Sequence, residues 1–304
     1  MMRLFQSENL KGIVLTESNH TSNQHVVDFA SSNTIPLFRA NKSNVTDELV
    51  KWILGLSPDI GICLTFPFKI PKQVIDAHTN GICNFHFGAL PDNAGAAPLF
   101  WTLSTADPTA VLTVHEMTTD FDSGHQILRK QLSIYPGENQ GLLGARLGQL
   151  ASESIDELFL KIENGITSDT TSVPTKLRKR PTIDDLTINW SEQDSMQIEA
   201  LVNATNPTYG GAITYFKNSM VKVLEVSPAQ VNNASLLGPG TIVHASAQEG
   251  IFVLCADYRF LRINVLETPE CILTGGKLAA LGIKAGDKFG KHEAVAPATS
   301  KLII

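Results

Sequence analysis

The chain has 304 residues, of which 43% are hydrophobic and 18% charged, a composition typical of globular proteins and outside the disordered range. Its formal net charge of −6 provides no overall positive surface for nucleic acid. The four cysteines form no CxxC pair, no apolar run reaches membrane-spanning length, and the first eight residues lack a signal-peptide core. We therefore expect a cytoplasmic protein with reduced thiols and no membrane partner.

Strand-like and helix-like segments alternate over residues 1–165. Thr46 is a plausible N-cap because Asp47 and Glu48 follow it in the first turn of an apolar-periodic segment. The alternation predicts an α/β fold with a doubly wound, mostly parallel sheet. We predict strands at 13–16, 59–65, 82–86, 110–117 and 126–134, and helices at 25–31, 47–56, 71–78, 96–104 and 143–162.

The pattern changes after residue 165. Residues 166–188 are polar, and the basic run Lys176 to Arg180 is typical of a solvated linker, with a weak anion-binding patch as the alternative. A short helix at 194–203 precedes short strands with frequent turns, which predict a small β-barrel or sandwich. We therefore predict a first domain at 1–165, a linker at 166–188 and a second domain at 189–304. The expected strands are 221–226, 241–245, 250–255 and 261–266.

Two polar residues stand out at the end of the predicted strand 82–86. Asn84 and His86 are two residues apart, so their side chains share one face of the strand. The loop that follows would place both groups at the carboxyl end of a strand, where open α/β sheets bind ligands. Asp122 adds a carboxylate further along, with Asp120 as its rival. Each residue alone has a plain structural explanation, because an asparagine or aspartate can form a turn and a histidine can be satisfied in a core.

Both segments resemble signatures of the folate-dependent formyltransferases. Gly81–Pro98 resembles a strand that ends Asn-x-His and continues Ser-x-Leu-Pro, and Thr113–Gly124 resembles a strand followed by Asp-Ser-Gly. Ile188–Ser191 and Ala204–Ala212 resemble the start of the C-terminal domain of the methionyl-tRNA formyltransferases in this family. The resemblance implies that residues 1–165 form the catalytic domain and that residues 189–304 form an OB-like β-barrel.

The resemblance also implies a reaction, the transfer of a formyl group from 10-formyltetrahydrofolate to a primary amine. Asn84 would donate a hydrogen bond to the tetrahedral oxyanion, His86 would move the proton of the amine, and Asp122 would orient and polarise His86. No metal is needed. His115 is expected to be structural or to line the pocket edge, and its strand position leaves open whether it faces solvent. The implied folate-binding residues are Phe66, Pro67, Phe68, Ile70, Thr119 and Asp120, and the implied acceptor-side residues are Gly88, Leu90 and Pro91, with Leu90 and Pro91 as loop anchors in the alternative.

Three departures from the family pattern affect the prediction. Met1 to Ser7 aligns with the end of the family's first helix, so its opening strand is not matched. Residues 16–24 contain no Lys or Arg where tRNA-binding members carry a basic loop, and phosphate contacts depend on such cations. Gly88, Asp92 and Ala94 replace a serine, an arginine and an aromatic residue. We therefore expect a small amine acceptor, such as an amino-sugar nucleotide or a biosynthetic amine, rather than tRNA. The alternatives are a catalytically impaired binding relative and a 10-formyltetrahydrofolate hydrolase.

Overall fold

The computed structural model describes residues 1–16, 23–165, 174, 176–231 and 237–290. The chain divides into two compact units, each assembled from three segments. The first unit comprises Met1–Pro98, Thr109–Ser133 and Ala145–Lys179, and the second comprises Leu99–Pro108, Ile134–Gly144 and Arg180–Ile304. The domain boundaries expected from the sequence remain predictions. No helix in the described ranges is long and apolar enough to cross a membrane.

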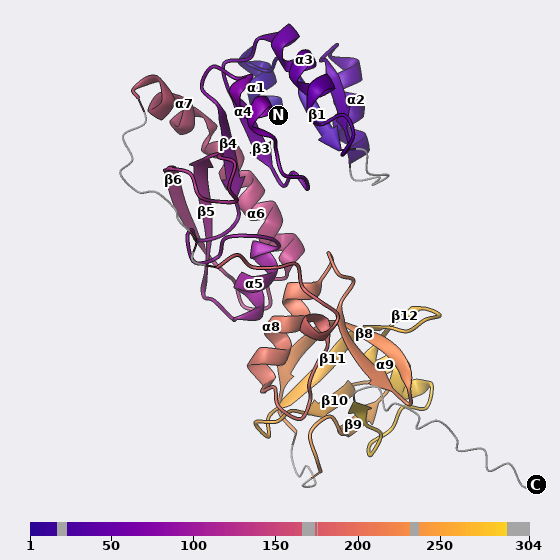
Figure 1. Cartoon of the computed structure of the whole chain (residues 1–304). Helices are drawn as coiled ribbons and strands as arrows, with labels where there is room; N and C mark the ends of the chain where they lie inside the picture. The colour runs from indigo at the N-terminus through magenta and orange to yellow at the C-terminus, as the bar shows by residue number, and fades with distance from the viewer. Residues whose placement is uncertain (17–22, 166–173, 175, 232–236, 291–304) are drawn as a thin grey trace, which may run out of the picture. The chain divides into compact units, whose positions relative to one another are not determined.

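Helices and strands alternate over the first half of the chain, as the sequence predicts (Figure 1). The strand β2 is an addition to the predicted set. The elements are α1 (Met2–Gln6), β1 (Ile13–Thr16), α2 (Gln24–Ser32), β2 (Leu37–Ala40), α3 (Asp47–Leu56), β3 (Gly61–Leu64), α4 (Lys72–Asp76), β4 (Ile82–His86), α5 (Pro98–Ser104), β5 (Thr109–Glu116), β6 (Gln126–Ser133), α6 (Gln140–Glu153) and α7 (Ile155–Glu163).

The strands of the first unit form two sheets among the described residues. Four strands follow the order β3-β4-β5-β6, in which β3 and β4 run parallel while β5 and β6 join antiparallel. The strands β1 and β2 pair in parallel with each other as a separate two-stranded sheet. The predicted α/β class is thus confirmed. Within the described part of the chain, β1 pairs only with β2, and β3 pairs only with β4.

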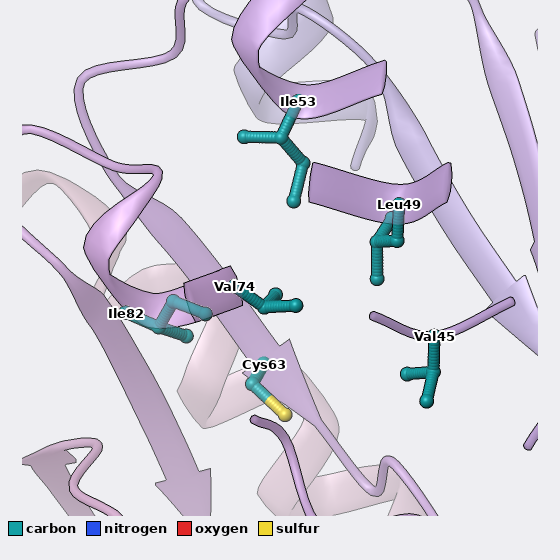
Figure 2. Packing of buried hydrophobic residues seen from close by; sticks show 6 residues of the cluster. All are labelled: Val45, Leu49, Ile53, Cys63, Val74 and Ile82. Atoms are coloured by element: carbon teal, nitrogen blue, oxygen red, sulfur yellow. The ribbon is translucent and has the colours of Figure 1, made fainter. Parts of the chain in front are cut away.

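A buried apolar cluster joins α3 and α4 to the strands of the first unit. Figure 2 shows Leu49 and Ile53 of α3 pointing toward the side of the cluster that holds Val74 and Cys63. Val14 and Phe38 from the two-stranded sheet pack against the same cluster. Burial of each such aliphatic side chain contributes on the order of 1.5–3 kcal/mol. The cluster therefore holds both sheets to the same pair of helices.

The predicted helix at 143–162 is two helices in the structure. Ser154 separates α6 from α7, and its buried hydroxyl donates a 2.7 Å hydrogen bond to the backbone oxygen of Leu150. A serine that bonds back to the preceding turn competes with the helix ladder and bends the chain. The apolar periodicity continues across this break, which explains why the sequence predicted one helix.

The second unit is built on an antiparallel sheet with the strand order β13-β7-β8-β11-β10-β9, with β12 paired to β11. Asp194 forms a capping box with Gln197 and starts α8, which packs on β8. The predicted small β domain is thus confirmed. Its elements are a 3₁₀ turn (Asp184–Leu186), α8 (Ser195–Thr205), β7 (Ala212–Phe216), β8 (Ser219–Ala229), β9 (Ile242–Ser246), β10 (Gly250–Leu254), β11 (Phe260–Glu267), β12 (Ile272–Thr274), α9 (Gly275–Ala280) and β13 (Phe289–Gly290).

Candidate functional site

The strand β4 separates its side chains by polarity. Cys83 and Phe85 are 1% and 2% exposed and belong to the apolar core. Asn84 and His86 alternate with them and therefore point to the other face of the strand. The antiparallel register places His115 of β5 directly opposite Asn84. One face of the β4–β5 pair thus holds an amide and two imidazoles.

Asp122 completes this cluster from the loop that follows β5. Its Oδ2 accepts a 2.7 Å hydrogen bond from the backbone N–H of Gly95. Its Oδ1 lies 3.6 Å from Nδ1 of His86 and 3.4 Å from Nε2 of His115. The structure therefore brings together the three side chains that the sequence singled out, Asn84, His86 and Asp122, and adds His115.

The loop that carries Asp122 has an unusual backbone. Asp122 has a φ of 52°, which a non-glycine residue adopts only at some cost in free energy. A Cβ atom at Gly124 would lie 1.8 Å from the backbone oxygen of Glu116, so only glycine fits there. Asp120, the rival carboxylate, is exposed, and its backbone oxygen accepts hydrogen bonds from Thr118 and Ser123. The geometry thus favours Asp122 over Asp120.

The ring of His86 is anchored at one nitrogen and faces a carboxylate with the other. Nε2 donates a 2.9 Å hydrogen bond to the backbone oxygen of Asn93, which leaves Nδ1 facing Asp122. Burial lowers the pKa of His86 below its usual range, and the carboxylate of Asp122 offsets part of that shift. At neutral pH the imidazole is therefore uncharged, as a proton acceptor must be.

The carboxyl group of Asp122 is held in its charged form. Burial alone would raise its pKa, but the neighbouring rings of His115 and His86 and the N–H of Gly95 together lower it. A carboxylate fixed in this way stabilises an adjacent imidazolium. The pair can therefore take up a proton at His86 and hold the resulting charge.

His115 is the residue whose involvement the sequence left open. It is only 2% exposed, so the solvent-facing alternative is wrong. Its Nε2 lies 3.1 Å from Nδ2 of Asn84, and its Nδ1 lies 2.8 Å from the backbone oxygen of Glu116. His115 joins the cluster because β4 pairs with β5. The residue pattern of one strand does not reveal which strand pairs with it, so the sequence alone did not place His115 here.

The predicted folate-binding residues occupy two neighbouring loops. The rings of Phe66 and Phe68 contact each other edge-on at 5.6 Å, while Phe66 and Ile70 also pack against the core cluster. Nζ of Lys69 lies 5.8 Å from the ring centre of Phe121, which joins the loop after β3 to the loop that carries Asp122. The loop after β3 thus contacts the loop that carries Asp122. The roles assigned to Phe66, Pro67, Phe68, Ile70, Thr119 and Asp120 remain predictions.

The predicted acceptor-side residues are mostly fixed by the protein itself. The backbone oxygen of Gly88 accepts a 2.7 Å hydrogen bond from Thr113, and Leu90 is 2% exposed with its oxygen bound by Arg129. The contacts favour the loop-anchor alternative for Leu90, and a substrate role for Gly88, Leu90 and Pro91 remains a prediction. Residues 17–22 of the non-basic loop lie outside the described residues. Within the described ranges, no group of three or more His, Cys, Asp or Glu residues could hold a metal ion.

A partly buried amide and a buried imidazole on one face of β4, with a buried carboxylate in the loop after β5, are groups suited to the transfer of an acyl-type group. Residues 5–157 match the family described as "Formyl transferase", and residues 182–277 match "Formyl transferase, C-terminal domain". The chain therefore belongs to the formyl transferase family, which its sequence motifs resemble.

Relatives of known name agree with this assignment. The methionyl-tRNA formyltransferase of Geotalea daltonii is 29% identical over 271 residues, which cover 87% of this chain and 83% of that protein. Two solved structures share the fold. The structure of HypX from Aquifex aeolicus in complex with tetrahydrofolic acid superposes on 91% of this chain with a TM-score of 0.66 and 15% sequence identity. The match covers 48% of the HypX chain. The structure of WlaRD, a sugar 3N-formyl transferase in the presence of dTDP and 5-N-formyl-THF, superposes with a TM-score of 0.56 and 15% sequence identity. That match covers 86% of this chain and 98% of the WlaRD chain.

Proposed function

We propose that this protein transfers a formyl group from 10-formyltetrahydrofolate to a primary amine. The observation that carries the proposal is the cluster formed by Asn84 and His86 on one face of β4 and by Asp122 in the loop after β5. Family membership supports the formyl chemistry. The folate compounds named with the HypX and WlaRD structures support the donor.

Each of the three side chains has one task in this reaction. The amine nitrogen attacks the formyl carbon, and Nδ2 of Asn84 donates a hydrogen bond to the oxyanion that forms. His86, which is uncharged at neutral pH, accepts the proton that the amine loses, and Asp122 stabilises the charged ring. The bond from the formyl carbon to N10 of the folate then breaks, and the proton passes to N10. The products are a formamide and tetrahydrofolate.

We infer that the acceptor is a small amine rather than a tRNA. Residues 16–24 contain no Lys or Arg, and the net charge of −6 opposes binding of a polyanion. The second candidate is methionyl-tRNA, because the curated relatives at 26–29% identity are named for that acceptor. The hypothesis of a small-amine acceptor rests on this chain's own residues, whereas the hypothesis of a tRNA acceptor rests on the names of its relatives.

A direct assay separates these possibilities. Purified protein is incubated with 10-formyltetrahydrofolate and either methionyl-tRNA, a panel of amino-sugar nucleotides or no acceptor. Formation of tetrahydrofolate together with a formylated small amine supports the proposal. Formylation of methionyl-tRNA alone supports the second candidate acceptor instead. Release of formate without any amine indicates a hydrolase instead. Absence of donor binding in calorimetry overturns the catalytic proposal altogether.

A further inference from the structure

His115 of β5 has a hydrogen-bond partner at each nitrogen of its ring. Nδ1 lies 2.8 Å from the backbone oxygen of Glu116. Because a carbonyl oxygen only accepts, Nδ1 must carry a hydrogen. In an uncharged ring Nε2 then carries none and accepts a hydrogen bond. The amide nitrogen of Asn84, 3.1 Å away, is the donor.

This tautomer decides which way the amide of Asn84 faces. With the amide reversed, Oδ1 would lie against Nε2, and two acceptors would oppose each other. The orientation with Nδ2 toward His115 avoids this, and it uses one of the two amide hydrogens. The second hydrogen of the same planar group remains available for another acceptor.

We propose that His115 is a positioning residue that holds the amide of Asn84 toward the formyl oxygen of the donor. The proposal rests on the proposed function, in which Asn84 stabilises the oxyanion. His115 itself does not touch the reacting atoms. A hydrogen-bond donor that is already oriented needs no reorganisation when charge develops on the oxygen, and this is the main source of its effect.

Nε2 of His115 has a second neighbour, which suggests a different role for this ring. Nε2 of His115 also lies 3.4 Å from Oδ1 of Asp122. That contact is favourable only when Nε2 carries a hydrogen, which makes the ring positively charged, and a charged ring cannot accept from Asn84. His115 can therefore position Asn84 only when its ring is uncharged, whereas a charged ring would act by pairing with Asp122.

Two substitutions at position 115 separate the ring nitrogens. His115→Asn keeps an amide near the position of Nδ1, which can still donate to the oxygen of Glu116, but it provides no acceptor for Asn84. His115→Gln provides an amide oxygen near the position of Nε2. We expect kcat to fall about 100-fold to 1,000-fold in His115→Asn, as for the loss of an oxyanion donor, and to recover to within about tenfold of wild type in His115→Gln. KM for the donor is expected to stay within about threefold, whereas a folding defect would lower the fraction of active protein.

A double-mutant cycle tests whether the effect passes through Asn84. In an Asn84→Ala background, His115→Asn is expected to cause less than about a threefold further loss, because the group that it positions is already absent. An undiminished loss in that background overturns the proposal and assigns His115 to Asp122 instead. Equal losses in His115→Asn and His115→Gln also overturn it.

A spectroscopic measurement on the wild-type protein does not depend on activity. Two-bond ¹H–¹⁵N correlation spectra at neutral pH are expected to show His115 with hydrogen on Nδ1 and none on Nε2. The side-chain amide of Asn84 is expected to shift in His115→Asn and to return toward its wild-type position in His115→Gln. The opposite tautomer overturns the positioning role even if formyl transfer is observed. If no formyl transfer occurs, the proposed function fails while these spectra still report on the contact.

Discussion

Nδ1 of His86 lies 3.6 Å from Oδ1 of Asp122, and both side chains are buried. The other nitrogen of His86 is bound to the backbone oxygen of Asn93, and the other oxygen of Asp122 to the N–H of Gly95. Because each group is anchored on its far side, neither can turn away from the other. The pair is therefore prepared to share the charge that arises when His86 takes up a proton.

Substitution of Asp122 by asparagine is expected to change both the rate and its dependence on pH. The carboxylate raises the pKa of His86 against the larger lowering by burial, so its removal lowers that pKa further. The acid limb of kcat/KM, which lies below the usual imidazole value of about 6.5 in the wild type, should move to still lower pH. The plateau rate should fall about 100-fold to 10,000-fold, because the charged ring is no longer stabilised.

The exposed Asp120 on the same loop offers the matched control for this experiment. Asp120→Asn removes an equal charge two residues away and should leave the acid limb of the pH profile in place. An acid limb that moves to higher pH in Asp122→Asn would contradict the charge interaction between Asp122 and His86.

Substitution of Asn84 by alanine is expected to reduce kcat about 100-fold to 1,000-fold, because the developing oxyanion loses its hydrogen-bond donor. KM for 10-formyltetrahydrofolate should change much less. Stopped-time assays of tetrahydrofolate formation measure both constants, and circular dichroism checks the fold. Asn80→Ala, at an exposed position just before β4, is the control and should retain wild-type turnover. Near-normal turnover in Asn84→Ala would remove the assigned role.

A serine at position 88, as in the family signature that the chain resembles, is expected to harm this protein. A Cβ atom there would lie 2.7 Å from Nε2 of His86 and 2.9 Å from the backbone oxygen of Asn93, which are the two partners of one hydrogen bond. We expect Gly88→Ser to lower the free energy of unfolding by about 1–3 kcal/mol and to reduce kcat. Urea denaturation and steady-state kinetics measure the two effects. Unchanged stability and rate would mean that the loop adjusts freely around His86.

Stability should decline as the pH falls below the usual imidazole value. The pKa of His86 is lowered by burial, so between about pH 6.5 and its lowered value the unfolded chain binds a proton that the folded chain does not. The free energy of unfolding therefore falls with falling pH in this window. Burial lowers the pKa of His78 as well, so its contribution has the same sign.

Urea denaturation at several pH values measures this slope. His86→Gln should make the free energy of unfolding less dependent on pH, whereas His25→Gln, at an exposed position of α2, should not. The lowered pKa of Asp122 adds stability that is present above about pH 3.9 and lost as the pH falls through the folded value. An unchanged slope in His86→Gln would contradict the uncharged state assigned to this ring.

The sequence predicted local features better than the relations between them. The helix at 47–56 and the strand at 82–86 were predicted to the residue, because apolar periodicity, acidic residues in a first turn and strand alternation are contained in short windows. The side chain of Thr46 itself makes no capping hydrogen bond. The position of His115 depends on β5 running antiparallel to β4, and periodicity does not encode strand direction. The anchor of Asp122 depends on the N–H of Gly95, 27 residues away, and on a φ of 52°, which aspartate tolerates but does not by itself specify. The candidate site was thus predicted as a set of residues, while its hydrogen bonds were not.

Substitution of Gly124 by alanine is expected to disrupt the loop that carries Asp122 without touching a reacting group. The added Cβ would lie 1.8 Å from the backbone oxygen of Glu116, and a backbone atom cannot move aside as the end of a side chain can. Because Glu116 pairs with Cys83 at the end of β5, the displacement would reach the strand that holds Asn84. We expect a loss of about 1–3 kcal/mol in the free energy of unfolding and a marked loss of kcat. Gly148→Ala in α6, where a Cβ meets nothing within 4 Å, should instead stabilise the protein by about 0.5–1 kcal/mol and leave kcat unchanged. If both variants behave alike, the close approach of Gly124 to β5 does not position Asp122.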